Sequence, residues 1–291
     1  MKILVAVDGS PDSNEAVSAV AHMATRLPAE IKVVTVVNPP DVPIDSSADL
    51  WVPQLMQQQE EIAKATLQRA AETLAGNGTV TTESMAGHVS HSILEAADDF
   101  GADLVVTGAI GHSPVSRIVL GSVSDDVATH AKQSVMVFRQ GDLFADADQP
   151  VRVTIAYDGS ESADKAIADF AEFAWAPDAI INVVSVAVKL EMFGQDLMPA
   201  AIEEAAKRRA DALRLAEAAA ERLKAAGCVT VAATMVESDH TGEGVLNAAA
   251  DHDSDLIIVG DKGHGFVARL FMGSTSRYVL RHAKQSVLIA R

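Results

Sequence analysis

Short apolar runs recur along this chain, and segments with helical periodicity separate them. The run over residues 3–7 is continuous, which is typical of a strand buried on both faces of a sheet, and similar runs follow at 31–37 and 104–107. Ser10 and Pro11 offer an N-cap residue and a proline at the first helical position, so a helix is predicted to start there. Alternating buried strands and helices predict an α/β fold with a doubly wound parallel sheet.

The same pattern predicts the remaining elements of the first half. Further strands are expected at 80–85 and 135–138, and helices at 91–100 and about 122–131. Prolines predict a loop over 38–53, before a long helix that ends near Gly76. In the second half, a long helix is expected to begin after Pro199 and stop at Gly227. Its apolar positions, predicted to pack on the sheet, are 202, 206, 213, 216, 220 and 223.

The sequence contains an internal repeat, in which the second half matches the first. KILVAVDGS at 2–10 matches RVTIAYDGS at 152–160, and HAKQSVMVFR at 130–139 matches HAKQSVLIAR at 282–291. A repeat this long indicates two domains rather than a solenoid. We therefore expect two tandem, Rossmann-like domains at 1–140 and 151–291, joined by a polar, acidic linker at 141–150. Each would hold a five-stranded parallel sheet of order 3-2-1-4-5 with helices on both faces.

The charge balance restricts the partners. The 291 residues hold 23 Lys and Arg against 40 Asp and Glu, a formal net charge of −17. This argues against nucleic acid and against anionic membrane surfaces, because both need a basic face. A single cysteine and the lack of an apolar run of about eighteen residues or more predict a soluble, cytoplasmic protein.

Glycines and aspartates follow the first and fourth strands of each copy. Asp8 and Asp158 end the first strand, and Gly108 and Gly260 end the fourth. Ligands of open α/β sheets bind outside the carboxyl ends of the strands, where the strand order switches, and order 3-2-1-4-5 makes these two strands neighbours. One carboxylate and one glycine loop should therefore flank a crevice in each domain.

The glycine loops have the features of a phosphate site. Glycines allow backbone N–H groups to approach a ligand closely, and a helix begins after the last glycine of each loop. Hydroxyl groups stand beside these helix starts. The chain has no GxxxxGK[ST] sequence, which excludes a Walker loop. The glycines and hydroxyl residues are Gly108, Gly111, Gly121, Ser122 and Ser124 in the first copy and Gly260, Gly263, Gly273, Ser274 and Ser276 in the second.

These motifs resemble those of the universal stress protein family. V-D-G-S follows the first strand, G-x2-G-x9-G-[ST] follows the fourth, and a tail like LRHAKQSVLIAR closes each copy. The resemblance spans nearly all of both copies, and it identifies a tandem member. It implies that the ten loop residues hold the phosphates and ribose of ATP, or of AMP or ADP. It also implies that Asp8 and Asp158 face the nucleoside, and that the backbones of Val36 and Val186 meet the adenine edge.

The expected function is that of a nucleotide-dependent regulator or stress-response module whose bound state a protein partner reads. Mg²⁺ is expected with the phosphates, because ATP adds negative charge to an acidic chain. Each loop has one histidine, His112 or His264, which is thin evidence for catalysis, so no catalytic residue is assigned and at most slow ATP hydrolysis is expected. The alternatives are a dimerisation scaffold that binds no nucleotide and a zinc-binding module at His88, His91 and His240.

Two further expectations follow from the doubling. The last strands, 135–138 and 287–290, would otherwise be open apolar edges, so the copies are expected to cover each other as an intrachain pseudo-dimer, and a homodimer of whole chains is plausible. The second expectation is unequal affinity. From Gly260 to Tyr278, three cations (Lys262, Arg269, Arg277) oppose one acid, which gives +2; from Gly108 to Asp126, one cation opposes two acids, which gives −1. The second domain is expected to bind ATP more tightly.

Overall fold

The computed structural model describes residues 1–25, 29–39, 48–111, 120–139, 149–172, 178–189, 198–263 and 272–291. The chain divides into two compact units, Met1–Gln140 and Gly141–Arg291. The predicted linker falls mostly on residues 140–148, which lie outside the described residues.

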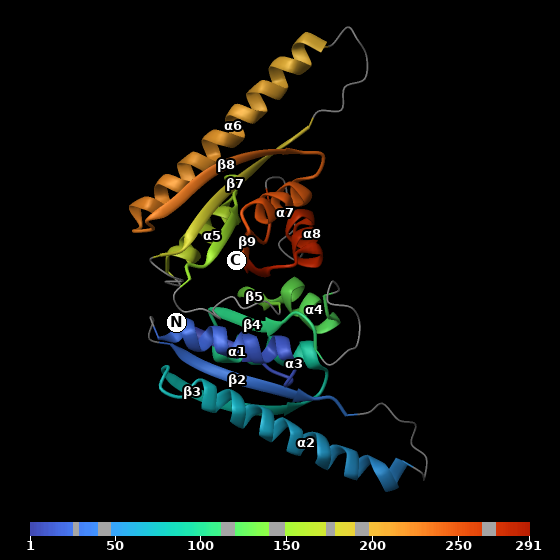
Figure 1. Ribbon diagram of the computed structural model, residues 1–291. Coiled ribbons are helices and arrows are strands. Elements are labelled where there is room, and N and C mark those ends of the chain that lie inside the picture. The colour runs from blue at the N-terminus through green and yellow to red at the C-terminus, as the bar shows by residue number, and fades with distance from the viewer. Residues whose placement is uncertain are drawn as a thin grey trace. The chain divides into compact units, whose positions relative to one another are not determined.

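The first unit alternates strands and helices as predicted (Figure 1). Its elements are β1 (Lys2–Ala6), α1 (Pro11–Ala24), β2 (Glu30–Val37), α2 (Ala48–Thr73), β3 (Thr79–Ala86), α3 (Val89–Phe100), β4 (Leu104–Gly108), α4 (Ser122–His130) and β5 (Ser134–Phe138).

The second unit repeats this sequence of elements. They are β6 (Arg152–Ala156), α5 (Glu161–Glu172), β7 (Ile180–Val188), α6 (Met198–Ala225), β8 (Thr230–Ser238), α7 (Thr241–Asp251), β9 (Leu256–Gly260), α8 (Ser274–His282) and β10 (Ser286–Ala290).

Both units have the predicted strand order, 3-2-1-4-5. In the first unit the order is β3-β2-β1-β4-β5, and in the second it is β8-β7-β6-β9-β10, with parallel pairing of neighbours. The central strand β1 pairs Ile3 with Ile31 on one side and with Leu104 on the other. These side chains are almost fully buried, as continuous apolar runs require.

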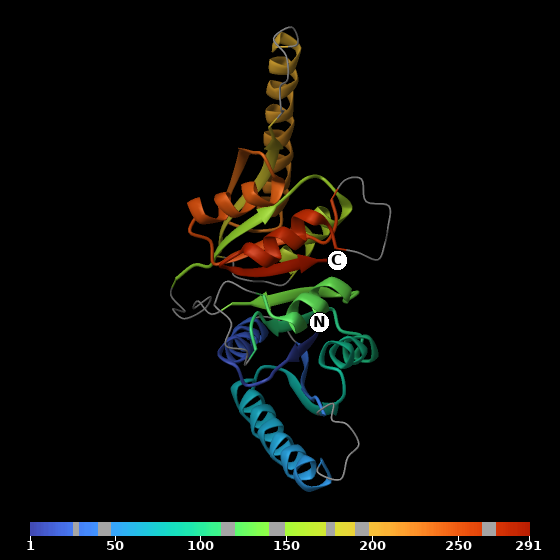
Figure 2. The same ribbon diagram turned by 90° about the vertical axis from the view of Figure 1, so that its right-hand side faces the viewer.

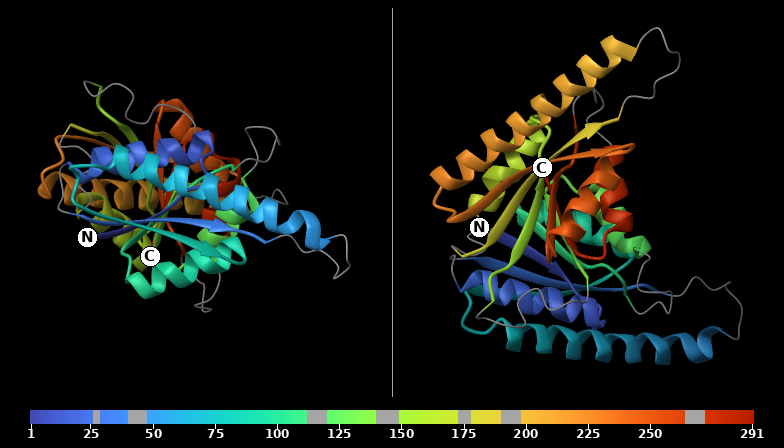
Figure 3. Two further views of the ribbon diagram at one scale, coloured as in Figure 1. Left: turned by 90° about the horizontal axis from the view of Figure 1, so that it is seen from below. Right: turned by 45° about the horizontal axis from the view of Figure 1, so that its top comes forward.

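Helices cover both faces of each sheet. In the first unit, α1 and α2 lie on one face and α3 and α4 on the other, as the left panel of Figure 3 shows for α1, α2 and α3. In the second unit, α5 and α6 pack together on one face and α7 and α8 on the other (Figure 3, right panel). At the start of α1, Ser10 is the N-cap and its hydroxyl accepts the Ser13 N–H, as predicted from the sequence.

The two long helices differ from the sequence prediction. Helix α2 begins at Ala48 and includes Pro53, where a loop was expected. The proline removes one helical hydrogen bond, but residues on both sides of it keep the helical conformation. On α6, positions 216, 220 and 223 are buried as expected, whereas Ile202 is 56% and Leu213 38% exposed. Ile202 belongs to the first half of α6, which extends beyond the strands that it was expected to cover (Figures 1 and 2).

No helix in the described ranges combines the length and the apolar character that a bilayer crossing requires.

Candidate functional site

Each unit has a cavity at the carboxyl ends of its first and fourth strands. The cavity in the first unit has a volume of about 320 Å³, and the one in the second about 370 Å³. Both values lie at the lower end of the range for small-molecule sites. The position is the one that the strand order predicts for a ligand.

Most of the predicted site residues line these cavities. The first cavity is lined by all seven predicted residues of its unit: Asp8, Val36, Gly108, Gly111, Gly121, Ser122 and Ser124. The second is lined by Asp158, Val186, Gly260, Gly263 and Ser276. Gly273 and Ser274 lie at the start of α8 outside this lining, and Thr275 lines the cavity instead.

The aspartate that follows the first strand is held in the same way in both units. One oxygen of Asp8 accepts the N–H of Ser10, and the same oxygen of Asp158 accepts the N–H of Ser160, both at 2.9 Å. The other oxygen lies against the second loop glycine. A Cβ placed on Gly111 would lie 2.6 Å from Asp8 Oδ2, and one on Gly263 would lie 2.8 Å from Asp158 Oδ2. A side chain at either glycine would therefore displace the carboxylate from this position.

The first glycine of each loop has a packing role. A Cβ on Gly108 would lie 2.7 Å from the backbone nitrogen of Ser13 in α1. A Cβ on Gly260 would lie equally close, 2.7 Å, to the carbonyl carbon of Ser162 in α5. The absence of a side chain lets the end of the fourth strand contact the first turn of the neighbouring helix. This contact places the helix, the aspartate and the loop around one cavity.

The last part of each loop leads into a helix start without a side-chain cap. Gly121 and Gly273 are the N-cap residues of α4 and α8, and neither helix has a side-chain hydrogen bond at its cap. The Ser124 hydroxyl donates to Ala109 O at 2.7 Å, and the Ser276 hydroxyl donates to Gly260 O at 2.6 Å. These two hydroxyls therefore close the loop onto its own helix, and among the described residues no side chain caps the first backbone N–H groups of α4 and α8.

The backbone of the second strand faces the gap that opens where the first strand ends. Val34 O accepts the N–H of Val7, so residue 34 faces β1, and Val37 O accepts the N–H of Gly87, so residue 37 faces the β3 side. Because these directions alternate along a strand, the backbone groups of Val36 point past the end of β1. Tyr157 N–H donates to Val184 O in the same manner, which places Val186 equivalently.

The second cavity has a wall that the sequence did not predict. Arg208, Asp211, Ala212 and Leu215 of α6 line it, whereas no described residue of α2 lines the first cavity. These four residues share one face of the helix, but that face lies beside the predicted apolar face and does not coincide with it. Lys262 also lines the second cavity, where the first has Ile110.

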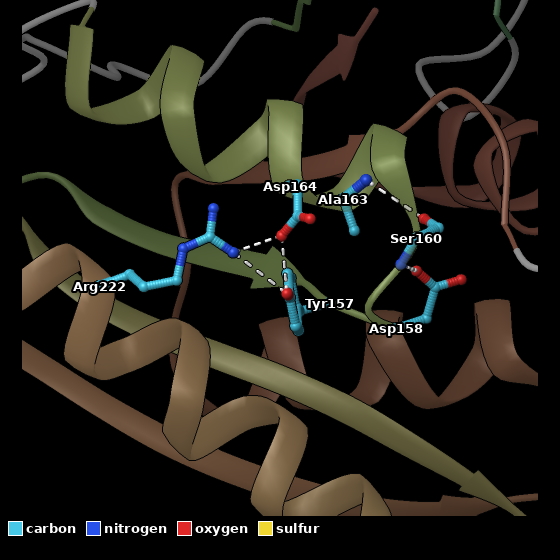
Figure 4. A network of polar contacts seen from close by, with 6 residues as sticks. All are labelled: Tyr157, Asp158, Ser160, Ala163, Asp164 and Arg222. Carbon is cyan, nitrogen blue, oxygen red and sulfur yellow. Dashed lines mark hydrogen bonds and ion pairs between the residues drawn. The ribbon is translucent and has the colours of Figure 1, made fainter.

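A polar network joins α5 and α6 beside this cavity. Tyr157, which replaces Val7 of the first unit, donates its hydroxyl to Asp164 Oδ1 at 2.8 Å, and Arg222 contacts both (Figure 4). Hydrogen bonds from Arg222 and Tyr157 lower the pKa of Asp164, while burial and Asp164 raise the pKa of Tyr157. Figure 4 shows that Asp158 and Ser160 lie apart from this network. The network therefore fastens α6, which forms the wall, to α5, and its Tyr157 also lines the cavity.

The predicted histidines do not gather into one site. His88 is the N-cap of α3, His240 is the N-cap of α7, and His91 Nε2 contacts Glu95 at 3.2 Å. The described residues include no group of three or more metal-binding side chains. His112 and His264 lie outside the described residues.

Comparisons with known proteins identify the family of this chain. The sequence model of the universal stress protein family matches residues 1–139 and again 151–291. A curated universal-stress-protein relative from Staphylococcus aureus (strain USA300) is 30% identical over 155 residues, which is 52% of this chain and 92% of the relative.

Two solved structures match this chain, and the match with the higher TM-score shows the similarity of the fold. The crystal structure of a universal stress protein from Archaeoglobus fulgidus DSM 4304 is 22% identical and has a TM-score of 0.69, and the match covers 100% of this chain and 96% of that one. A universal stress protein solved in complex with cAMP is 25% identical, with a TM-score of 0.36, over 48% of this chain and 98% of its own. The chain belongs to the universal stress protein family, whose domain it carries twice.

Proposed function

We propose that each unit binds an adenine nucleotide in its cavity, and that the chain acts as a nucleotide-dependent regulator. The observation that carries this proposal is the arrangement common to both units. A carboxylate packs on a loop glycine, and the same loop leads into a helix whose first N–H groups have no side-chain cap. A second copy of this arrangement would be hard to explain if the loop merely turned the chain.

The cavity offers a place for each part of the nucleotide. The uncapped helix starts at Gly121 and Gly273 suit phosphate oxygens, because backbone N–H groups and the helix dipole attract anions there. Asp8 and Asp158 suit ribose hydroxyls, because a carboxylate accepts hydrogen bonds. The backbone groups of Val36 and Val186 suit the adenine edge, which has both donors and acceptors.

The second site should bind ATP more tightly. Of the described residues that line the first cavity, Asp8 is the charged one, whereas two cations, Arg208 and Lys262, and two acids, Asp158 and Asp211, line the second. Residues 112–119 and 264–271, which lie outside the described ranges, each contain one histidine and one arginine, so they do not alter this difference in charge. Asp125 lies in the first turn of α4, where α8 has no acidic residue.

We also propose that Mg²⁺ binds together with the phosphates of the nucleotide. The chain has a formal charge of −17, and the groups that position the phosphates are backbone dipoles with only partial charge. A divalent cation that bridges phosphate oxygens would reduce the repulsion. The proposal includes a protein partner that recognises the nucleotide-bound state. It also includes a homodimer of whole chains.

The test combines three measurements. Mass spectrometry of the natively purified and then denatured protein should detect ATP, ADP or AMP. Calorimetry on the nucleotide-stripped chain should show two sites for ATP in magnesium, and weaker binding in EDTA. AMP and cAMP serve as comparison ligands, and sizing with and without ATP tests assembly. Absence of binding by every nucleotide would reject the proposal in favour of a scaffold, and equal ATP affinity in EDTA would reject the role of Mg²⁺.

A further inference from the structure

A buried carboxylate joins α1 to the glycine loop in the first unit. Asp12, in the first turn of α1, is only 8% exposed, and its Oδ2 accepts the backbone N–H of Ile110 at 3.1 Å. Arg139 follows the end of β5 and is 7% exposed. Burial lowers the pKa of Arg139 to about 10, and the charge of the Asp12 carboxylate opposes that shift. Ile110 lines the cavity, whereas Asp12 does not.

The second unit also has a buried carboxylate between its first helix and its glycine loop. There the carboxylate belongs to the loop rather than to the helix. Ser162 occupies the place of Asp12 on α5, and Asp261 occupies the place of Ala109 in the loop. The Ser162 hydroxyl donates to Asp261 Oδ1 at 2.6 Å, and Arg291, the counterpart of Arg139, has its Nε 3.7 Å from Asp261 Oδ2. Asp261 is 6% exposed and does not line the cavity.

The backbone around the two carboxylates is equivalent. Ala109 N–H donates to Phe138 O, and Asp261 N–H donates to Ala290 O. In both units, therefore, this loop residue is hydrogen-bonded to the last residue of the fifth strand, directly before the arginine. The helix carries the acid and the loop supplies a donor in the first unit. In the second unit, the loop carries the acid and the helix supplies a donor.

We propose that Asp12 with Arg139, and Asp261 with Arg291, are positioning residues that hold the glycine loop against the neighbouring helix in the geometry that binds phosphate. This inference rests on the proposed function. The shared feature is the link between helix and loop, and the origin of the acid differs. A buried pair that only stabilised the fold would have no reason to join the same two elements from opposite directions.

The two arrangements can be exchanged within the first unit. Asp12→Ser removes the acid and introduces the residue that the second unit has there. Asp12→Ser/Ala109→Asp rebuilds the arrangement of the second unit. Asp99→Ser, at an exposed acid of α3, makes the same change in charge away from the loop. All three changes are made in the Gly263→Val background, so that only the first site reports.

Calorimetry should show ATP affinity lower by about tenfold in Asp12→Ser, the equivalent of one hydrogen bond, and restored to within about threefold in the double variant. Asp99→Ser should leave it unchanged. Hydrogen exchange of a peptide spanning 104–111, measured without nucleotide, should accelerate in Asp12→Ser and slow again in the double variant. If Asp12→Ser fails to fold, Asp12→Asn replaces it, and the gain from adding Ala109→Asp is measured on that background.

Two outcomes would overturn the inference. One is an affinity and an exchange rate that Asp12→Ser changes no more than Asp99→Ser does. The other is a double variant that regains its unfolding temperature but neither its slow exchange nor its affinity. If no variant and no parent binds ATP, the proposed function fails, and the exchange rates still decide whether the pair positions the loop.

Discussion

The two cavities share a backbone frame and differ in their charges. In both, the fourth strand ends on a glycine that packs against a helix start, and the second loop glycine packs on an aspartate. Around this frame the first unit has Ile110 and Asp125, whereas the second has Lys262 and a wall from α6. The comparison teaches that close backbone contacts define where the cavity lies, and that side chains around it can change its electrostatics without moving it.

The largest expected effect concerns the shared frame. Gly108→Ala and Gly260→Ala should each lower the free energy of unfolding by about 1–3 kcal/mol, because each Cβ would lie 2.7 Å from helix backbone that cannot rotate away. Thermal unfolding without nucleotide measures this. The two variants should be destabilised to a similar extent; a large loss in one and less than about 0.5 kcal/mol in the other would break the claim that the frame is common.

A smaller effect concerns the residue that differs between the loops. Lys262→Ile should weaken ATP binding at the second site by up to about tenfold, because it removes a cation from the cavity lining, and the reverse change Ile110→Lys should strengthen the first site. Calorimetry at low and high ionic strength measures both. The Lys262 ammonium lies 2.9 Å from Asp261, so some of its charge is already balanced. If both variants kept their ATP affinity at low salt, the Lys262/Ile110 difference would not explain the unequal affinity of the two sites.

The smallest effect concerns the first turn of α4. Asp125→Asn should strengthen the first site by about two- to fivefold, since an acidic side chain competes with phosphate for the positive end of a helix. Asp126 lies one residue beyond the first turn, and its Oδ1 is 2.8 Å from His130 Nδ1. Asp126→Asn is therefore the matched control and should have less effect. A larger gain in Asp126→Asn would contradict the helix-dipole argument.

The repeated apolar runs were sufficient to predict the fold. A buried parallel strand such as the one at 3–7 is predicted by consecutive apolar residues, and the start of the next helix is predicted by Ser10 and Pro11. Pro53 and Ile202 were misassigned, because a helix can tolerate a proline and can extend past the sheet, and the local sequence pattern records neither. These two errors concern where long helices lie relative to the sheet rather than whether they form.

The site could be predicted only in part. Glycine spacing identified the loops, because close backbone approach demands glycine wherever it occurs. The carboxylates of Asp12 and Asp261 were missed, since they occupy different positions in the two copies and become equivalent only in space. Arg208 was missed for a similar reason, because nothing in a helical sequence tells which turn passes over a cavity.

Calorimetry with ATP on Gly111→Val and Gly263→Val tests the central claim most directly. A side chain at either position would collide with the aspartate carboxylate of its own site, 2.6 Å away in the first unit and 2.8 Å in the second, so each variant should keep one site. We expect Gly111→Val to retain the tighter site and Gly263→Val the weaker one, with up to about tenfold between them. Tighter binding by Gly263→Val would contradict the charge argument, and two remaining sites in either variant would contradict the proposed location of the nucleotide.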